Sequence, residues 1–303
     1  MRPGDLYRGI SLSFSPGATV SSSSSSLPPC YHSRVVPDRV DLYDTSYGNS
    51  ELPAYREIRR ETYGQDLGQT SWATAEEFQL IARQLELAPE SSVLEIGSGS
   101  GGCAIYFARA IGCRVTGLDL NPQGIAAANQ LADSQGVGDT VIFQQHDAST
   151  PLPFTAAAFD AIYSNDAFCH LLVRPALLRE CRRVLKPGGR LLFSDALVVS
   201  GPISNEEIAT RSSIGRCLFV PHGENECMLV ESGFELLQSD DTSREAAAIA
   251  QRWHDARARL RDQLVPVEGE GNFLGLQRFL DCVRTLTGEK RLSRFRYLAR
   301  RPS

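Results

Sequence analysis

The chain has 303 residues, eight of them cysteines, and its 36 acidic and 31 basic residues give a formal net charge of -5. This length permits a sizeable buried core, which excludes a small module held together by disulfides, and the cysteines form no CxxC pair, so no metal site is expected. The acidic balance and the lack of any run of about 18 apolar residues predict a small-molecule partner, with no nucleic acid and no membrane.

The first 38 residues differ in composition from the rest of the chain. Ser21 to Ser26 are consecutive serines, and Asp5 is the only acidic residue before Asp38. Such a segment cannot form a packed core, so we predict that residues 1–38 are disordered. Organelle transit peptides are also serine-rich and poor in acids. We therefore expect a cytoplasmic protein, or a plastid or mitochondrial one if this segment is a transit peptide.

Residues 39–90 show the spacing of helices that precede the core, and we predict that they form an N-terminal helical lid. The region contains Trp72 and is rich in tyrosine, at positions 43, 47, 55 and 63. Tyrosines in such helices are often half-buried core residues, but they can also face a ligand. They are therefore candidates for both roles.

From residue 91 to residue 200, short apolar runs alternate with helical patterns. We predict strands near 92–96, 114–119, 140–145, 159–164 and 189–195, and helices near 101–111, 122–136 and 173–185. Lys186 to Gly189 should end the last helix and turn the chain into the last strand. This alternation indicates an α/β fold with a parallel sheet, in which ligands bind at the carboxyl ends of the strands.

Residues 201–303 are less regular. Helical apolar spacing over 244–284 predicts a helical insertion that forms part of a cap, and residues 294–299 should form the last strand. The basic run from Lys290 to Arg296 alternates charged and apolar residues. We therefore expect one face of that strand to be exposed to solvent.

The run VLEIGSGSGG, residues 93–102, carries the strongest indication of a cofactor. Gly97, Gly99 and Gly102 also satisfy the dinucleotide fingerprint, so the glycine spacing leaves a nicotinamide-dependent oxidoreductase or a non-catalytic nucleotide-binding protein open. Glu95 argues against these alternatives, because a carboxylate there repels a diphosphate and suits an ammonium or sulfonium. Asp119 ends the next apolar run, where an acid can hold both ribose hydroxyls.

Five segments in this region resemble the motifs of class I S-adenosylmethionine-dependent methyltransferases. In chain order they are VLEIGSGSGG, LDLN at 118–121, HDA at 146–148, SNDAF at 164–168 and LKPGGRLLFSD at 185–195. The resemblance implies a Rossmann-like fold with a mostly parallel seven-stranded sheet, helices on both faces and a helical cap. Residues 91–200 would be the cofactor-binding core, and residues 201–303 the C-terminal part of that core with the cap insertion.

The same resemblance implies which residues bind S-adenosylmethionine. The methionine end would lie against Glu95 and the backbone of Gly97, Ser98 and Gly99, with Asn165 nearby. The ribose would be held by Asp119, next to Leu120. The adenine would contact Asp147 and Ala148.

The acceptor side is similar to that of phosphoethanolamine methyltransferases, and the core is similar to that of sarcosine and dimethylglycine methyltransferases as well. Tyr47, Tyr55 and Tyr63 resemble a tyrosine ladder, and Asp166 with His170 resembles an Asp-x-x-x-His pattern. The resemblance implies catalytic roles for His170, Asp166, Tyr47 and Tyr63. A histidine is a natural acceptor for the proton of an amine, and Asp166 would share its pocket if the segment is helical.

These features predict an S-adenosylmethionine-dependent methyltransferase that acts on a small metabolite as a monomer or homodimer, with N-methylation of an amine as the first expectation. Transfer to oxygen, sulfur or carbon, as in ubiquinone, tocopherol or sterol methyltransferases, is the alternative. A hydrophobic cap would favour that alternative, whereas acids or aromatic faces in the pocket would favour an amine. A substrate carboxylate would call for an arginine, with candidates at Arg56, Arg59, Arg60 and Arg216.

Overall fold

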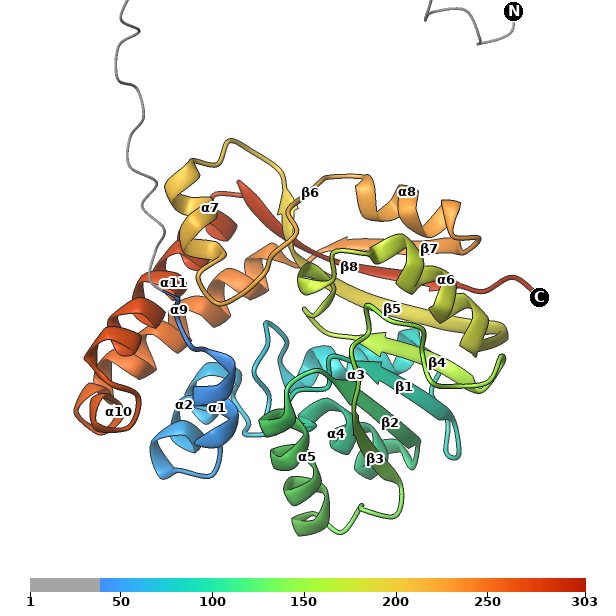
Figure 1. Cartoon of the computed structure of the whole chain (residues 1–303), viewed down its shortest axis with the longest axis horizontal. Coiled ribbons are helices and arrows are strands. Elements are labelled where there is room, and N and C mark those ends of the chain that lie inside the picture. The colour runs from blue at the N-terminus through green and yellow to red at the C-terminus, as the bar shows by residue number, and fades with distance from the viewer. Residues whose placement is uncertain (1–38) are drawn as a thin grey trace, which may run out of the picture. The chain divides into compact units, whose positions relative to one another are not determined.

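The computed structural model describes residues 39–303, which are coloured in Figure 1. The predicted disordered segment and the transit-peptide hypothesis concern residues 1–38, which lie outside the described residues. Within the described part, no helix is both long and apolar enough to cross a membrane.

A mixed sheet forms the centre of the fold. Its strands are β1 (Ser92–Ile96), β2 (Arg114–Asp119), β3 (Val141–Gln145), β4 (Phe159–Ser164), β5 (Leu185–Val199), β6 (Val220–Pro221), β7 (Glu235–Asp241) and β8 (Leu292–Arg300). The order is β3-β2-β1-β4-β5-β8-β7, with the short β6 paired to β5 beside this seven-strand path. The strands from β1 to β6 pair in parallel, whereas β8 is antiparallel to both β5 and β7. The predicted α/β fold with a mostly parallel sheet is confirmed.

Helices cover both faces of the sheet. On one face, α3 (Ala75–Gln84), α4 (Gly102–Ile111) and α5 (Pro122–Ser134) pack against side chains such as Val93. On the other, α6 (Arg174–Val184) and α8 (Glu224–Glu231) pack against side chains such as Leu94. Neighbouring residues of β1 thus enter opposite cores, because side chains alternate along a strand.

The start of β5 corrects one sequence prediction. Lys186 to Gly189 were expected to be a turn outside the strand, but β5 already begins at Leu185, which pairs with Phe159. The register then shifts before pairing resumes at Arg190. Gly188 has a φ of 77° within this irregularity, a conformation that costs glycine little. The residues predicted to form a turn are therefore an irregularity within the strand.

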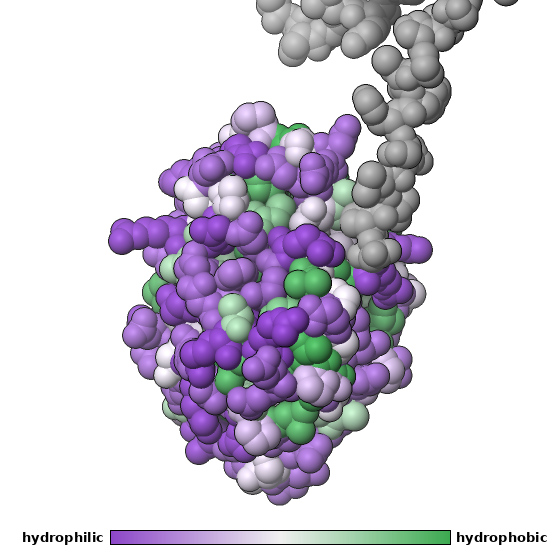
Figure 2. All heavy atoms as spheres, turned by 90° about the vertical axis from the view of Figure 1, so that its left-hand side faces the viewer, coloured by the Kyte–Doolittle hydropathy of each residue, from purple (hydrophilic) through white to green (hydrophobic). Residues whose placement is uncertain are grey.

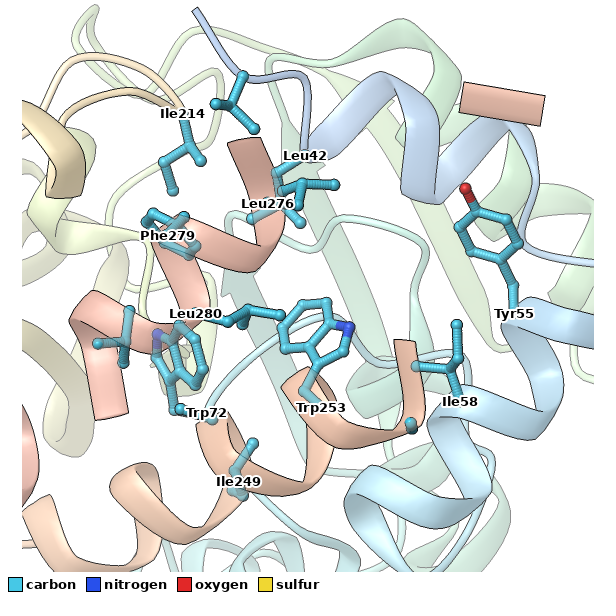
Figure 3. Close-up of a cluster of buried hydrophobic side chains, with 14 of the residues drawn as sticks. Leu42, Tyr55, Ile58, Trp72, Ile214, Ile249, Trp253, Leu276, Phe279 and Leu280 are labelled. Atoms are coloured by element: carbon cyan, nitrogen blue, oxygen red, sulfur yellow. The ribbon is translucent and has the colours of Figure 1, made fainter. Parts of the chain in front are cut away.

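The remaining helices form a second layer beside the strand ends, on the left of Figure 1. They are α1 (Tyr43–Gly48), α2 (Pro53–Tyr63), α7 (Asn205–Arg211), α9 (Ser243–Arg259), α10 (Arg261–Glu268) and α11 (Glu270–Gly288). Here α2 and α11 both pack on α9 around one buried cluster that includes Ile58, Trp253 and Leu280 (Figure 3). Helices predicted before the core and over residues 244–284 therefore meet in one apolar core.

The outer face of this helical layer is largely hydrophilic, with small apolar groups between polar side chains (Figure 2). Arg259 of α9 reaches two carboxylates of α2 there, Glu57 and Glu61. Such half-exposed pairs contribute little to stability. The buried cluster beneath them therefore does most to hold the helices together.

Strand β8 corrects the prediction for the basic run. Arg294 is fully buried and Arg296 is 6% exposed, so neither lies on a solvated face. The strand β8 lies between β5 and β7, and its side chains enter the cores on both faces of the sheet, with Leu298 in one and Tyr297 in the other. The alternating pattern was right for a strand, but the charged face points into a buried network of ion pairs.

Candidate active site

A cavity of about 760 Å³ lies where the carboxyl ends of the parallel strands meet the helical layer. Residues at or after the ends of β1, β2, β3 and β4 line one part of its wall, among them Gly97, Asp119, Asp147 and Asn165. Residues of the helical layer, of β5 and of the loops beside them line the rest. This is the edge at which open parallel sheets bind ligands.

The glycine loop between β1 and α4 forms a second, smaller cavity of about 50 Å³, which shares Gly97 and Asn165 with the large one. Gly97 and Gly99 have φ angles of 75° and 52°. A Cβ at Gly97 would clash with the Cβ of Ala167, and one at Gly99 would lie 2.8 Å from Tyr47 Oη. The loop therefore needs glycine for its conformation and for close packing.

Glu95 lies beneath this loop and is 3% exposed. Its Oε2 has no hydrogen-bond partner among the described residues. Burial raises the pKa of Glu95 to about 8, with a further contribution from Asp119 and an opposing one from the Ala104 amide. A buried carboxylate oxygen without a partner is costly, and an ammonium group in the adjoining cavity would relieve that cost. The residues present thus fit the cationic methionine end of S-adenosylmethionine.

Asp119 connects the end of β2 to the glycine loop. Its Oδ2 accepts a hydrogen bond from the Gly99 amide at 2.7 Å, and its Oδ1 accepts one from the Asn121 amide at 2.8 Å. Burial nevertheless raises the pKa of Asp119, since it outweighs these amides. Each carboxylate oxygen can accept a further hydrogen bond. The side chain is thus held in place with acceptor capacity left for a diol.

The structure brings all the predicted cofactor residues together. Glu95, Ser98 and Gly99 line the small cavity, Asp119, Leu120, Asp147 and Ala148 line the large one, and Gly97 and Asn165 line both. The Asp147 carboxylate accepts from the Ser149 amide at 2.9 Å, and bonds to Ser149 lower the pKa of Asp147. Together the two adjoining cavities extend from a buried carboxylate, past a second acid, to the loop after β3.

S-Adenosylhomocysteine should bind more tightly as the pH rises from about 6 to about 7.5. In the free protein Glu95 remains protonated up to its pKa of about 8, whereas a bound ammonium favours the ionised form, so binding expels a proton. Affinity should therefore rise by up to about 20-fold over this window. Calorimetry in buffers of different ionisation enthalpy measures both the affinity and the proton. Glu95→Gln should bind with little pH dependence, and a flat wild-type profile would contradict this role.

Asp119→Ala should weaken S-adenosylhomocysteine binding by about 1 to 3 kcal/mol, through the loss of charged hydrogen bonds. Calorimetry at fixed pH provides the measurement. Asp139→Ala is the matched control. Asp139 is an exposed acid just before β3, at the amino ends of the parallel strands and therefore away from the cavity. If Asp119→Ala binds as tightly as this control, the ribose assignment is refuted.

His170 lies in the short 3-10 helix η1 (Phe168–His170) and lines the large cavity. Its Nδ1 lies 2.8 Å from the carbonyl oxygen of Arg216, and its Nε2 lies 2.7 Å from Tyr43 Oη. A carbonyl only accepts, so Nδ1 carries the proton and the Nε2 lone pair accepts from Tyr43. Burial lowers the pKa of His170, but contacts with Cys217 and the Arg216 carbonyl outweigh it and raise that pKa above its ordinary value.

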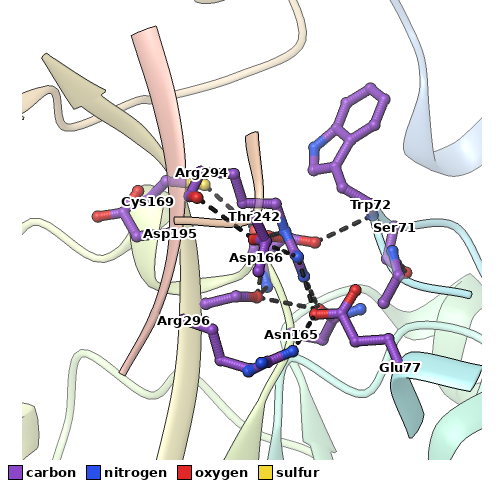
Figure 4. A network of polar contacts seen from close by, with 12 residues as sticks. Ser71, Trp72, Glu77, Asn165, Asp166, Cys169, Asp195, Thr242, Arg294 and Arg296 are labelled. Atoms are coloured by element: carbon purple, nitrogen blue, oxygen red, sulfur yellow. Dashed lines mark hydrogen bonds and ion pairs between the residues drawn. The ribbon is translucent and has the colours of Figure 1, made fainter. Parts of the chain in front are cut away.

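Asp166 does not share a helical face with His170, because it has a φ of 55° and η1 begins only at Phe168. Its Oδ1 accepts from Ser194 Oγ at 2.9 Å and from Arg294 Nε at 2.8 Å. Its Oδ2 accepts from the Trp72 amide at 3.0 Å. Figure 4 shows this network. Asp166 lines the cavity, but its carboxylate fastens the loop that carries Trp72.

The predicted tyrosines lie in different surroundings. Tyr47 lines both cavities beside Gly99. Tyr63 lies outside the residues that line them, and its hydroxyl donates to the Ser71 carbonyl at 3.0 Å. The Tyr55 hydroxyl donates to Glu268 at 3.3 Å. The tyrosine that contacts His170 is Tyr43, which lies one helical turn before Tyr47. The sequence predicted no catalytic role for Tyr43.

The far part of the large cavity has an apolar and aromatic wall. Its members come from distant parts of the chain and are Leu42, Trp72, Leu197, Ile214, Trp253 and Phe279. All of these except Leu197 are labelled in Figure 3. The ring centroids of Trp72 and Trp253 lie 5.7 Å apart, and those of Trp72 and Phe279 lie 6.4 Å apart. The same aromatic side chains therefore line the cavity and pack in the core of the helical layer.

Of the four arginines proposed for a substrate carboxylate, Arg216 lines the large cavity. It is an exposed side chain. Arg56 and Arg59 line a separate surface cavity, where Arg59 pairs with Asp66 at 2.6 Å. Arg60 lines neither this cavity nor the large one. The buried arginine of the wall is Arg211, at the end of α7, which no local sequence motif marks.

Three comparisons relate the chain to known proteins. Residues 94–193 match the family model described as a methyltransferase domain. The chain is 30% identical to 27-O-demethylrifamycin SV methyltransferase of Amycolatopsis mediterranei, over 82% of this chain and 90% of the relative. It is 36% identical to sarcosine/dimethylglycine N-methyltransferase of Halorhodospira halochloris, but over only 43% of this chain and 46% of the relative.

A solved structure shows the same fold. Phosphoethanolamine N-methyltransferase 2 of Haemonchus contortus, in complex with S-adenosyl-L-methionine, superposes with a TM-score of 0.70 at 19% identity. The superposition covers 85% of this chain and 60% of that one. At this identity the likeness concerns the fold alone.

Proposed function

The chain belongs to the S-adenosylmethionine-dependent methyltransferases, and from this premise we propose that it methylates the nitrogen of a small amine, with the pair Tyr43–His170 removing the proton. When bound, the cofactor supplies an electrophilic methyl group on a sulfonium. The enzyme then contributes mainly by aligning the nucleophile with that group in a closed site. The single observation that carries the proposal is the 2.7 Å contact between Tyr43 Oη and His170 Nε2 on the cavity wall.

The pair accounts for every proton in the step. Tyr43 Oη would accept the proton of the acceptor nitrogen and pass its own proton to His170 Nε2. Meanwhile the new N–CH3 bond would replace the S–CH3 bond of the cofactor, which would leave as S-adenosylhomocysteine. The resulting imidazolium keeps its Nδ1 bond to the Arg216 carbonyl, which favours the charged form. Burial raises the pKa of Tyr43 well above its ordinary value. A free tyrosinate is therefore unfavourable, so the two transfers should be coupled.

The aromatic wall supports a nitrogen acceptor. The aromatic side chains of Trp72, Trp253 and Phe279 line the far part of the cavity, with Arg211 packed over the Phe279 ring. Aromatic faces attract alkylated ammonium groups by about 0.5 to 2 kcal/mol each. Tyr47 lies beside both the glycine loop and Tyr43, and the ring centroids of Tyr43 and Tyr47 are 6.0 Å apart. We therefore assign Tyr47 a part in orienting the acceptor.

Turnover of S-adenosylmethionine labelled in its methyl group, against a panel of primary and secondary amines, phenols and thioethers, tests the proposal. Label should appear in at least one amine. Label in phenols alone would refute the nitrogen assignment. If S-adenosylhomocysteine raises the melting temperature but no acceptor is labelled, the catalytic proposal fails and a binding protein remains.

Transfer to oxygen is the second candidate, favoured by the apolar members of the wall, Leu42, Leu197 and Ile214. One relative, which aligns over 90% of its own length, is named for 27-O-demethylrifamycin SV. A hydroxyl can donate its proton to Tyr43 in the same way as an amine. The same labelled panel therefore distinguishes the two acceptor atoms.

A further inference from the structure

Arg211 is a buried cation on the wall of the large cavity. It ends α7 and is 4% exposed. Its guanidinium carbon lies 4.9 Å from the centroid of the Phe279 ring, so the planar group is held against an aromatic face. Its charge acts to lower the pKa values of Tyr43 and His170, against the factors that raise them, which indicates that it lies near that pair. The guanidinium thus belongs to the acceptor part of the cavity.

This arginine differs from the other buried arginines of the described chain. Each of the others pairs with a carboxylate: Arg59 with Asp66, Arg174 with Asp195, Arg257 with Glu268, Arg294 with Asp166 and Arg296 with Glu77. Arg211 has no such partner within residues 39–303, and its buried Nε has no hydrogen bond there. A guanidinium is always charged and carries five donors. Leaving it buried and unpaired is costly unless a ligand supplies the acceptor.

We propose that Arg211 binds a carboxylate of the methyl acceptor, which would make the substrate an amine that also carries a carboxylate. The inference rests on the proposed function for the amine. A single guanidinium balances one negative charge, and its two parallel N–H groups match the two oxygens of a carboxylate. The apolar wall around it accommodates the carbon skeleton. The acceptor is then fixed at one end, with its nitrogen presented to Tyr43.

Tryptophan fluorescence can test this without turnover, because the only two tryptophans in the chain, Trp72 and Trp253, both line the cavity. With S-adenosylhomocysteine saturating, phenylacetate and phenylacetamide are titrated separately. They have nearly the same shape and differ in charge. Phenylacetate should bind about 10-fold tighter or more, as expected for a charged hydrogen-bonded pair. Equal affinity, or no change of emission with phenylacetate, would overturn the proposal.

Variants locate the effect. Arg211→Met should lose the preference for phenylacetate, and Arg211→Lys should keep part of it because the charge remains. Arg259→Met removes the same charge from the outer face of the helical layer and should leave the preference unchanged. If Arg211→Met keeps the wild-type preference, the carboxylate lies elsewhere.

A turnover pair separates this proposal from the proposed function. N-methylphenylalanine and its carboxamide offer the same amine with and without the negative charge. Equal methylation of both supports an amine methyltransferase and overturns the role of Arg211. If neither compound is methylated while phenylacetate still binds selectively through Arg211, the role of Arg211 in binding a carboxylate is retained. The proposal that the enzyme methylates the nitrogen of such amines is then refuted.

Discussion

Replacing His170 by alanine should lower the rate of methyl transfer about 100-fold or more, while S-adenosylhomocysteine affinity stays within about 2-fold of wild type. The imidazole is the final proton acceptor of the pair, and Tyr43 alone has no group to which it can pass its proton. His170 lines the cavity but is not among the residues beside the glycine loop. Single-turnover kinetics with labelled S-adenosylmethionine measure the rate, and calorimetry measures cofactor affinity.

The pH profile identifies the group responsible. In the wild type, the rate should fall as the pH drops through the pKa of His170, which is raised above its ordinary value, because the protonated imidazole cannot accept. His170→Ala should lose this acidic limb. Tyr43→Phe should show a comparable loss of rate, since the relay needs both groups. His222→Ala serves as the control, since that ring packs on Phe295 outside the residues that line the cavity. Near-normal turnover of His170→Ala would show that His170 is not the proton acceptor and has only a packing role.

The core of the fold could be predicted because its information is local. Apolar runs that end in an acid, such as the one ending at Asp119, reflect strands buried on both faces with polar residues at the ligand edge. The cofactor residues follow from the same rule, since parallel strands bring their carboxyl ends together. Every residue predicted to bind the cofactor therefore lines one of two adjoining cavities.

The acceptor side could not be predicted in the same way, because it is assembled from distant segments. Tyr43 and His170 are 127 positions apart, and Tyr43 and Tyr47 lie on one helix with no local mark to show which meets the histidine. Arg211 ends a short helix, and its guanidinium packs over Phe279 from the distant helix α11. Side chains at such positions are identified by burial and by missing partners, which the sequence does not contain.

The buried network around Arg294 illustrates the same limit and gives the largest expected change in stability. Arg294 Nε and Nη1 bond to Asp166 and Glu77 at 2.8 Å each, and its other contacts reach Asn165 and Thr242 at 2.9 Å (Figure 4). Arg294→Met removes the charge but leaves both carboxylates enclosed. We expect the free energy of unfolding to fall by about 3 to 5 kcal/mol, the usual cost of breaking a buried pair on one side. Urea denaturation measures the change.

Arg300→Met is the matched control for this prediction. Arg300 lies on the same strand and pairs with Glu235, but both side chains are almost half exposed. Solvent screens such a pair, so its loss should cost at most about 1 kcal/mol. Adding Asp166→Asn to Arg294→Met should recover part of the loss, because the buried carboxylate then loses its charge. If both single variants unfold at the same urea concentration, the network does not stabilise the fold. The Asp166 bond to the Trp72 amide would then be the remaining physical reason for a buried charge at this point of the cavity wall.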